Sequence, residues 1–220
     1  MATPIRVLIG DDHRIVREGL KQVLADAPEV QVLAEAQSGS EVLERVLALG
    51  GASGLDVVLL DIAMPGRDGL DVLQALRKDW PGLPVLMLST YPEKQYAVRC
   101  IKLGAAGYLN KSADADDMVA AVRKVAGGGV YVTPATAEAL ATAMGSSATG
   151  KSGPEALSHR EYQVFRLLTA GHSVTEIGAQ LNLAANTVST YRARILEKTG
   201  SKNDVELALF AERHGRSSNL

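Results

Sequence analysis

Several short polar segments of this chain each follow a short apolar run, and their side chains are of types that bind phosphate and metal ions. The residues concerned are Asp11 and Asp12, Asp61, Ser89 and Thr90, Tyr108, and Lys111. Mg²⁺ prefers oxygen ligands, and phosphoryl transfer depends on charge neutralisation and positioning. Three carboxylates, a hydroxyl and an ammonium therefore predict a site for a divalent metal and a phosphoryl group, provided that these segments meet in space.

Each of these side chains has an expected role in such chemistry. Asp12 and Asp61 can bind a metal ion directly, and Asp11 can hold a coordinated water. Carboxylates packed this closely repel each other, so a metal or a proton has to be present. Lys111 can pair with a carboxylate first and with a phosphoryl group afterwards. The hydroxyl of Ser89 can donate to a phosphoryl oxygen.

The elements that would position these residues follow from the alternation of short apolar runs with helical patterns between residue 5 and about 126. This alternation predicts βα units and a parallel sheet. In such a sheet, ligands bind at the carboxyl ends of the strands, where the strand order reverses. We expect strands at 5–10, 30–36, 56–61, 84–89 and 106–109, and helices at about 14–26, 39–49, 68–79, 93–103 and 114–126.

The third expected strand, 56–61, indicates which carboxylate reacts. Its sequence DVVLLD is apolar between its acids. A central parallel strand is covered on both faces and requires such a continuous apolar run. Asp61 ends this strand and is therefore the expected nucleophile.

Composition places the chain in a broad class. Its 220 residues allow one large domain or two small ones. The single cysteine, Cys100, excludes an internal disulfide and fits a reducing compartment. No run approaches the roughly 18 apolar residues of a membrane span, and the N-terminus lacks a signal peptide pattern. We expect a soluble, cytoplasmic protein. The histidines show no metal-ligand spacing, so surface or capping roles are expected for His13, His159, His172 and His214.

A composition change divides the chain in two. The stretch GSSATGKSGP at 145–154 is typical of a flexible linker. We expect a first domain at 1–127, a linker at 128–154 that includes a short helix at 134–144, and a second domain at 155–220. Residues 1–154 carry 15 lysines and arginines against 18 acidic residues, and 155–220 carry 8 against 7. The positive charge of the second domain is local and modest.

The second domain is predicted to be all helical. Ser158 and Glu161 have the spacing of a capping box, which predicts a helix start there. Gly171 ends that helix, and further helices are expected at about 175–181, 186–198 and 203–214. Two helices joined by a short turn at 182–183 form the helix-turn-helix pattern. In the helix at 186–198, Val188, Tyr191 and Ile195 share one apolar face.

The opposite face of that helix predicts contact with DNA. Ser189, Thr190 and Ala193 are small, so the backbone could approach a major groove closely and meet base edges. Cations on the flanks would lie near phosphates. The alternative is a helical packing module with a solvated basic face. The candidate DNA-contacting residues are Thr187, Ser189, Thr190, Arg192, Ala193, Arg194 and Lys198.

The first domain resembles the receiver domain of bacterial response regulators, which has a flavodoxin-like (βα)5 fold. The likeness rests on the acidic pair after the first strand, DxxMPGxxGL at 61–70, Ser-Thr after the fourth strand and GYLxK at 107–111. It implies that Asp61 accepts a phosphoryl group from the phosphohistidine of a sensor histidine kinase. Phosphorylation would then shift a two-state receiver.

The same resemblance assigns roles around Asp61. Ser89 would move onto the phosphoryl group while Tyr108 swings inward as a switch, although a half-buried core position explains this tyrosine nearly as well. Lys111 would contact the phosphoryl group. The Mg²⁺ ligands implied are Asp11, Asp12, Asp61 and the backbone carbonyl of Ala63.

The second domain resembles the LuxR-type helix-turn-helix of the LuxR/NarL (FixJ) response regulators. The likeness covers about 157–214, and TVSTYRARI is similar to the recognition helix of the BvgA/EvgA branch. It implies a homodimer, controlled by phosphorylation, on inverted half-sites of double-stranded DNA, with the last helix helping the domains pair. The implied function is transcription regulation, with RNA polymerase as a further candidate partner.

Three other interpretations stay open at this point. An aspartyl-phosphate hydrolase would need a second acid two residues after the nucleophile, where this chain has Ala63, so turnover of an external substrate is not expected. A ligand-sensing regulator would need an apolar pocket in the first domain. The first domain could also be a receiver that only contacts other proteins, with a degenerate second domain that does not bind DNA.

Overall fold

The protein folds into two compact units, Met1–Ser146 and Ser147–Leu220. The structure is a computed structural model that describes residues 3–65, 67–90, 93–145 and 157–216. Most of the linker that the sequence predicts at 145–154 lies outside the described residues.

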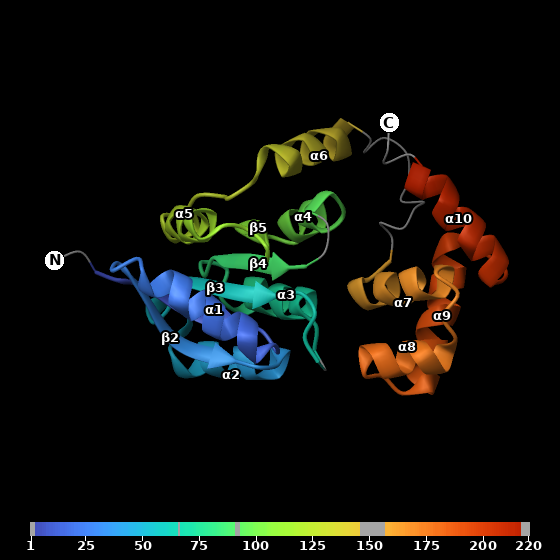
Figure 1. Cartoon of the computed structure of the whole chain (residues 1–220), viewed down its shortest axis with the longest axis horizontal. Helices are drawn as coiled ribbons and strands as arrows, with labels where there is room; N and C mark the ends of the chain where they lie inside the picture. The colour runs from blue at the N-terminus through green and yellow to red at the C-terminus, as the bar shows by residue number, and fades with distance from the viewer. Residues whose placement is uncertain (1–2, 66, 91–92, 146–156, 217–220) are drawn as a thin grey trace. The chain divides into compact units, whose positions relative to one another are not determined.

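The first unit is built on a parallel sheet with the strand order β2-β1-β3-β4-β5 (Figure 1). All five strands predicted from the sequence are confirmed to within one residue at either end. This order reverses after β2, since β3 pairs with the other side of β1. The strands are β1 (Ile5–Gly10), β2 (Val30–Ala36), β3 (Val57–Asp61), β4 (Val85–Ser89) and β5 (Gly107–Asn110).

Helices cover both faces of this sheet (Figure 1). Helix α1 packs beside α5, α2 packs beside α3, and α4 packs against β5 and α6. A short 3-10 helix at Gly51–Ser53 was not predicted. The α-helices of this unit are α1 (Arg14–Ala25), α2 (Gly39–Ala48), α3 (Gly69–Asp79), α4 (Glu93–Lys102), α5 (Ala115–Ala126) and α6 (Pro134–Gly145).

The burial of the strands follows their place in the sheet. Every residue of β3 and β4 is buried, whereas in the edge strand β2 only Ala36 is buried and the other residues are half-buried or exposed. Successive strand residues point to opposite faces. Val7 and Ile9 accordingly pack into a core with α1 and α5, and Leu8 between them is buried toward the other face. The continuous apolar runs are thus explained by helices on both sides.

Part of the segment predicted as a linker contacts the first unit. The backbone N–H of Tyr131 donates to the carbonyl of Ala106 at 2.8 Å, and Tyr131 forms an isolated bridge with Gly107 at the edge of β5. Helix α6 then packs on α4. The compact unit accordingly extends well beyond residue 127.

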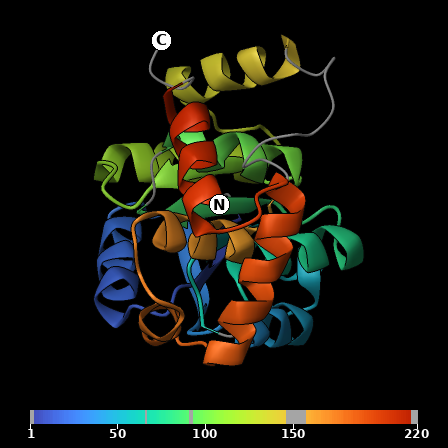
Figure 2. The same ribbon diagram turned by 90° about the vertical axis from the view of Figure 1, so that its right-hand side faces the viewer.

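The second unit is all helical, as predicted. Val188 and Ile195 of its third helix are fully buried in a core to which Tyr191 adds, which confirms the apolar face expected there. Figure 2 turns these helices, coloured orange to red, toward the viewer. Among the described residues, no helix combines the length and apolar character needed to cross a bilayer. The helices are α7 (His159–Thr169), α8 (Val174–Leu181), α9 (Ala185–Thr199) and α10 (Asp204–Arg216).

Side-chain caps fix where several helices begin. The capping box predicted for Ser158 and Glu161 is present, and a second one, formed by Ser173 and Glu176, opens α8. Between α8 and α9, Asn182 adopts the left-handed conformation with φ of 54°. Asparagine tolerates this conformation at a helix end better than most residues do, so it suits the turn of the helix-turn-helix.

Gly69 is one of several glycines where the neighbouring backbone leaves no room for a side chain. Gly69 begins α3, and a Cβ at this position would lie 2.0 Å from the backbone carbonyl oxygen of Asp61. Its N–H donates to the carbonyl of Ile62 at 2.9 Å. Gly69 therefore lets α3 start directly against the end of β3.

We expect Gly69→Ala to lower the free energy of unfolding of the first unit by about 1–3 kcal/mol, the usual cost of overpacking. Trp80, the chain's single tryptophan, lies in this unit and reports its unfolding in urea by fluorescence. Gly19→Ala is the matched control. Apart from its chain neighbours and the backbone of its own helix, no atom lies within 4 Å of a Cβ there, so the exchange should stabilise α1 by up to about 1 kcal/mol. Equal urea midpoints for the two variants would contradict the steric argument.

Candidate functional site

The predicted acidic residues and the lysine meet at one edge of the sheet. Asp11 follows β1, Asp61 ends β3, and Lys111 follows β5. Lys111 Nζ lies 2.7 Å from Asp11 Oδ2 and 2.8 Å from Asp61 Oδ2. The side chain of Lys111 is 8% exposed, and those of Asp11 and Asp61 are 0% and 2% exposed. One buried ammonium thus bridges two buried carboxylates.

Backbone contacts hold this arrangement in place. The N–H of Lys111 donates to the carbonyl of Ser89 at 2.8 Å, which ties the lysine to the end of β4. The N–H of Asp11 donates to the carbonyl of Ala36 at 3.0 Å, at the end of β2. The site is therefore fixed by the ends of several strands rather than by a flexible loop.

Burial and neighbouring charges shift the ionisation of this cluster. Burial raises the pKa of Asp61 to about 6, while the attraction of Lys111 opposes that rise and Asp11 adds to it. Burial alone would lower the pKa of Lys111, but Asp61 and Asp11 raise it above its ordinary value. The carboxyl groups of Asp11, Asp12 and Asp61 thus gather around one ammonium, and such an acidic set of oxygen donors suits a divalent cation.

Ser89 and Tyr108 lie on the two strands nearest to Lys111. Ser89 is the last residue of β4, where it is 1% exposed and pairs in register with Asn110. Tyr108 lies in β5 and is also 1% exposed. Both are thus packed inside the unit. Ala63 lies two residues after Asp61 in the sequence and is half-buried.

His13 joins the cluster, although its sequence position had indicated a surface or capping role. Its Nδ1 lies 2.8 Å from Asp12 Oδ1 and 3.4 Å from Asp11 Oδ1. His13 is the N-cap residue of α1, but its side chain makes no capping hydrogen bond. The direct succession of Asp12 and His13 was the signal that sequence reasoning passed over.

A buried arginine supports the acidic loop from behind. Arg17 on α1 is 6% exposed, and its Nη1 donates to the backbone carbonyl of Asp11 at 2.8 Å. Its Nε donates to Glu35 of β2 at 3.1 Å, and Lys21 donates to the other oxygen of Glu35 at 2.7 Å. Arg17 thus connects the loop after β1 to both α1 and β2. The signal for it was a basic residue on the inward face of a helix.

The face of α9 opposite its core is exposed, as the DNA-contact prediction requires. The exposed predicted residues are Thr187, Ser189, Thr190, Ala193, Arg194 and Lys198. Two of the predicted phosphate contacts are engaged within the unit. Arg192 Nε lies 2.8 Å from Asp204 Oδ1 of α10, and Lys198 Nζ lies 2.6 Å from Glu161 Oε2 of α7. Arg194 is exposed, and among the described residues its side chain forms no ion pair or hydrogen bond.

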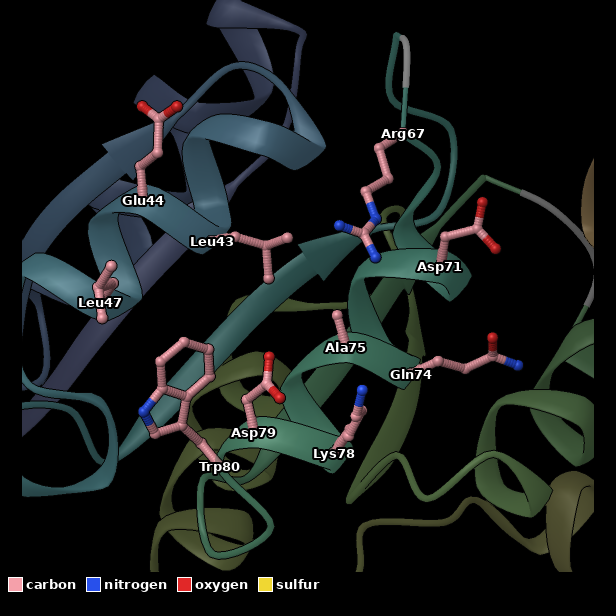
Figure 3. Close-up of a pocket in the computed structure, with 10 residues that line it drawn as sticks. All are labelled: Leu43, Glu44, Leu47, Arg67, Asp71, Gln74, Ala75, Lys78, Asp79 and Trp80. Carbon is pink, nitrogen blue, oxygen red and sulfur yellow. The ribbon is translucent and has the colours of Figure 1, made fainter.

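A separate groove of about 590 Å³ runs between α2 and α3 (Figure 3). Its apolar lining comes from Leu43 and Leu47 of α2, Ala75 of α3 and Trp80 at the end of α3. None of the residues predicted for the metal and phosphoryl site lines it. Charged side chains such as Arg67 and Asp79 surround it, so it is an open surface feature of mixed character.

Comparisons with known proteins agree with this architecture. Residues 7–123 match the response regulator receiver domain, and residues 155–211 match the bacterial regulatory proteins of the luxR family. The response regulator GacA of Pseudomonas viridiflava is 39% identical over 211 residues, which cover 96% of this chain and 97% of that protein. The response regulator UvrY of Escherichia coli K12 is 35% identical, covering 96% and 95%.

Solved structures extend the likeness to the fold. The crystal structure of the response regulator ChrA, from a heme-sensing two-component system, is 32% identical with a TM-score of 0.53, covering 96% of this chain and 98% of that one. The RcsB response regulator of Salmonella typhimurium shares the fold at 24% identity and a TM-score of 0.57, covering 96% and 99%. This chain belongs to the LuxR/NarL family of response regulators, with a receiver domain followed by a LuxR-type helix-turn-helix domain.

Proposed function

We propose that Asp61 of the receiver accepts a phosphoryl group from the phosphohistidine of a sensor histidine kinase, and that this event controls DNA binding by the second unit. The observation that carries the proposal is the buried ammonium of Lys111 between the carboxylates of Asp11 and Asp61. Such a contact holds Asp61 at the carboxyl end of the sheet, where a parallel sheet binds its ligands.

The transfer requires one bond to form and one to break. A carboxylate oxygen of Asp61 attacks phosphorus, the bond between phosphorus and the imidazole nitrogen of the donor breaks, and that nitrogen keeps the electron pair. Lys111 then turns its charge from the Asp61 carboxylate to the phosphoryl oxygens. Ser89 donates a hydrogen bond to one of them. Tyr108, next to this edge in β5, takes the role of a switch that responds to the move of Ser89.

The donor set fits Mg²⁺. Asp11, Asp12 and Asp61 supply oxygen ligands, and the backbone carbonyl of Ala63 supplies another. Oδ2 of Asp11, Oδ1 of Asp12 and Oδ2 of Asp61 are buried and accept no hydrogen bond from the described residues, although the ion pairs with Lys111 and His13 lie close. When bound, Mg²⁺ would neutralise the charge that builds up on the phosphoryl oxygens.

The site is suited to holding a phosphoryl group rather than to turning over an external substrate. A hydrolase of the aspartyl-phosphate type needs a proton donor close to the nucleophile. Ala63 stands at that position and has no titratable side chain. The phosphorylated state is then a signal, and DNA binding in the second unit is its output.

For DNA binding we propose that α9 enters the major groove. Its exposed face presents Ser189, Thr190 and Ala193 to base edges, and Arg194 to a phosphate. Arg192 and Lys198 contribute to DNA binding indirectly, because their ion pairs fix α9 against α10 and α7. Contact with RNA polymerase stays a prediction.

Helix α10 supports the proposal of a homodimer. Val205 and Leu209 lie four residues apart on one side of the helix and are 71% and 51% exposed. Apolar side chains grouped in this way gain free energy when a second copy covers them. Phosphorylation would promote this pairing and so place two copies of α9 on two half-sites.

With Mg²⁺ and a small acyl phosphate as donor, we expect the protein to gain one phosphoryl group and Asp61→Asn to gain none, because an amide is not a nucleophile here. Intact-protein mass spectrometry measures the label. Asp116→Asn, which changes an exposed carboxylate at the start of α5, should be labelled like the unchanged protein. A label of equal size on Asp61→Asn would refute the assignment.

Arg194→Ala should weaken binding to duplex DNA and reduce the slope of log K against log salt concentration by roughly 1, because one phosphate contact is lost. Fluorescence anisotropy over a series of salt concentrations gives the slope. Lys124→Ala removes an exposed charge from α5 and should leave the slope unchanged. An unaltered slope in Arg194→Ala would show that this side chain faces away from DNA.

Leu209→Glu should weaken self-association of the phosphorylated protein by about tenfold or more, since it replaces a partly exposed apolar contact by a charge that loses its hydration in the interface. Sedimentation velocity over a range of concentrations gives the dissociation constant. Leu47→Glu is the control, because Leu47 is 69% exposed but lies on α2. If both variants associate as the unchanged protein does, α10 is not the pairing surface.

A further inference from the structure

His13 is a nitrogen ligand placed beside the acidic cluster, and the proposed phosphotransfer does not use it. Its backbone N–H donates to Asp11 Oδ1 at 2.8 Å, which fixes where its side chain starts. From there Nδ1 approaches Asp12 Oδ1 to 2.8 Å. The imidazole is 63% exposed, so this side of the cluster is open to an ion arriving from solvent.

The close approach of His13 to Asp12 lacks the geometry of a hydrogen bond. Asp12 Oδ1 is buried and accepts no hydrogen bond from the part of the chain that the structure describes, even though Nδ1 lies at hydrogen-bond distance. A well-formed N–H···O bond needs the hydrogen to point at the oxygen. The two atoms thus lie at ion-pair distance without a well-formed hydrogen bond, and their separation is also the one that two ligand atoms of one metal ion have.

The separations suit shared coordination. Metal–nitrogen and metal–oxygen bonds of the small divalent ions are about 2.1 Å long, so neighbouring ligand atoms lie about 3 Å apart. His13 Nδ1 lies 2.8 Å from Asp12 Oδ1 and 3.4 Å from Asp11 Oδ1. Ligand atoms of Asp11, Asp12, His13 and Asp61 all lie within 4.8 Å of one another. One ion can thus reach all four side chains after small rotations.

Asp11 and Asp61 form the buried part of the cluster. They are 0% and 2% exposed, and an oxygen of each is directed at Lys111 without a hydrogen bond from other described groups. Counting Asp12, three carboxyl groups gather around one ammonium. A divalent cation balances the negative charge of such a set, and the imidazole of His13 adds a nitrogen ligand to the oxygen ligands.

The kind of ligand selects the kind of ion. Mg²⁺ takes oxygen ligands almost exclusively and gains little from an imidazole. Zn²⁺, Co²⁺ and Ni²⁺ bind imidazole well and bind mixed nitrogen and oxygen sites more tightly than Mn²⁺ does. An imidazole at this place therefore raises the affinity for borderline transition-metal ions and leaves the affinity for Mg²⁺ nearly as it was.

We propose that His13 is a ligand of the metal site, together with Asp11, Asp12 and Asp61, and that it makes this receiver a site for borderline divalent ions of the Zn²⁺, Co²⁺ and Ni²⁺ class. The inference rests on the proposed function, since it assumes that the acidic cluster binds the cation needed for phosphorylation. Such an ion and Mg²⁺ exclude each other, so the availability of the transition metal sets how many receivers can be phosphorylated with Mg²⁺.

Co²⁺ is the probe, because its visible absorption spectrum changes when nitrogen replaces oxygen among its ligands. The full chain is titrated with Co²⁺ and, separately, with Mg²⁺ by calorimetry. His13→Ala should weaken Co²⁺ binding by about tenfold or more and change the absorption spectrum, while Mg²⁺ binding should change by no more than about twofold. His172→Ala, in the second unit, is the control for adventitious binding to a histidine and should behave as the unchanged protein.

Two results overturn the inference, and each is separable from a failure of the proposed function. If His13→Ala binds Co²⁺ as the unchanged protein does, His13 is not a ligand. If it loses Co²⁺ and Mg²⁺ affinity equally, His13 only positions Asp12. In both cases Mg²⁺ still binds the unchanged protein and Asp61 is still phosphorylated. An unchanged protein that binds neither ion instead removes the metal site on which the proposed function depends.

Discussion

The ammonium of Lys111 makes it possible for two carboxylates to lie buried at adjacent strand ends. Asp11 and Asp61 are almost fully removed from water, and without a cation their mutual repulsion would push a proton onto one of them. Loss of one member of a buried ion pair usually costs about 3–5 kcal/mol, because the partner keeps a charge with no compensation. The lysine therefore stabilises the resting state of the site, in addition to the role that we propose for it in phosphotransfer. Because Lys111 supplies one positive charge to two carboxyl groups, the site can still attract a second cation.

That interaction depends on the topology of the sheet. The strand order places β1 next to β3, and all strands run in parallel, so their carboxyl ends meet at one edge. Asp61 and Lys111 are far apart in sequence, but Asp61 ends β3 and Lys111 follows β5, and only β4 separates these two strands. The continuous apolar runs of β3 and β4 bury the strands on both faces. Helices on both faces leave this edge as the place where a polar cluster can be reached. The same burial that stabilises the sheet raises the pKa of Asp61.

Sequence reasoning predicted those features that depend on local pattern. Alternating apolar runs and helical periods gave every strand of the sheet, and the spacing of Ser158 and Glu161 gave the start of α7. It missed features that depend on contacts between distant residues. His13 and Arg17 belong to the site because the fold places the loop after β1 and the start of α1 beside β2. Their local signals, an aspartate before the histidine and a basic residue on an inward helix face, do not by themselves predict these contacts. The pairing of Tyr131 with the edge of β5 was missed for the same reason. Ion pairs between residues that are distant in sequence determine which of the cations predicted to contact DNA remain without a partner among the described residues of the unit.

The second unit applies the same electrostatic principle to α9. Its positive charge is small, so the way in which each cation is paired matters more than their number. Arg192 is held by Asp204 and Lys198 by the buried carboxylate of Glu161, whose pKa is raised by burial but lowered overall by Lys198 and by the Ser158 cap. These pairs fix α9 between α10 and α7, which limits how it can turn, and they leave Arg194 exposed beside the small residues of the outer face. Arg192 and Lys198 must break these ion pairs before they can bind a phosphate. Affinity for DNA in a single copy should therefore be modest, which is consistent with the homodimer on two half-sites that we propose.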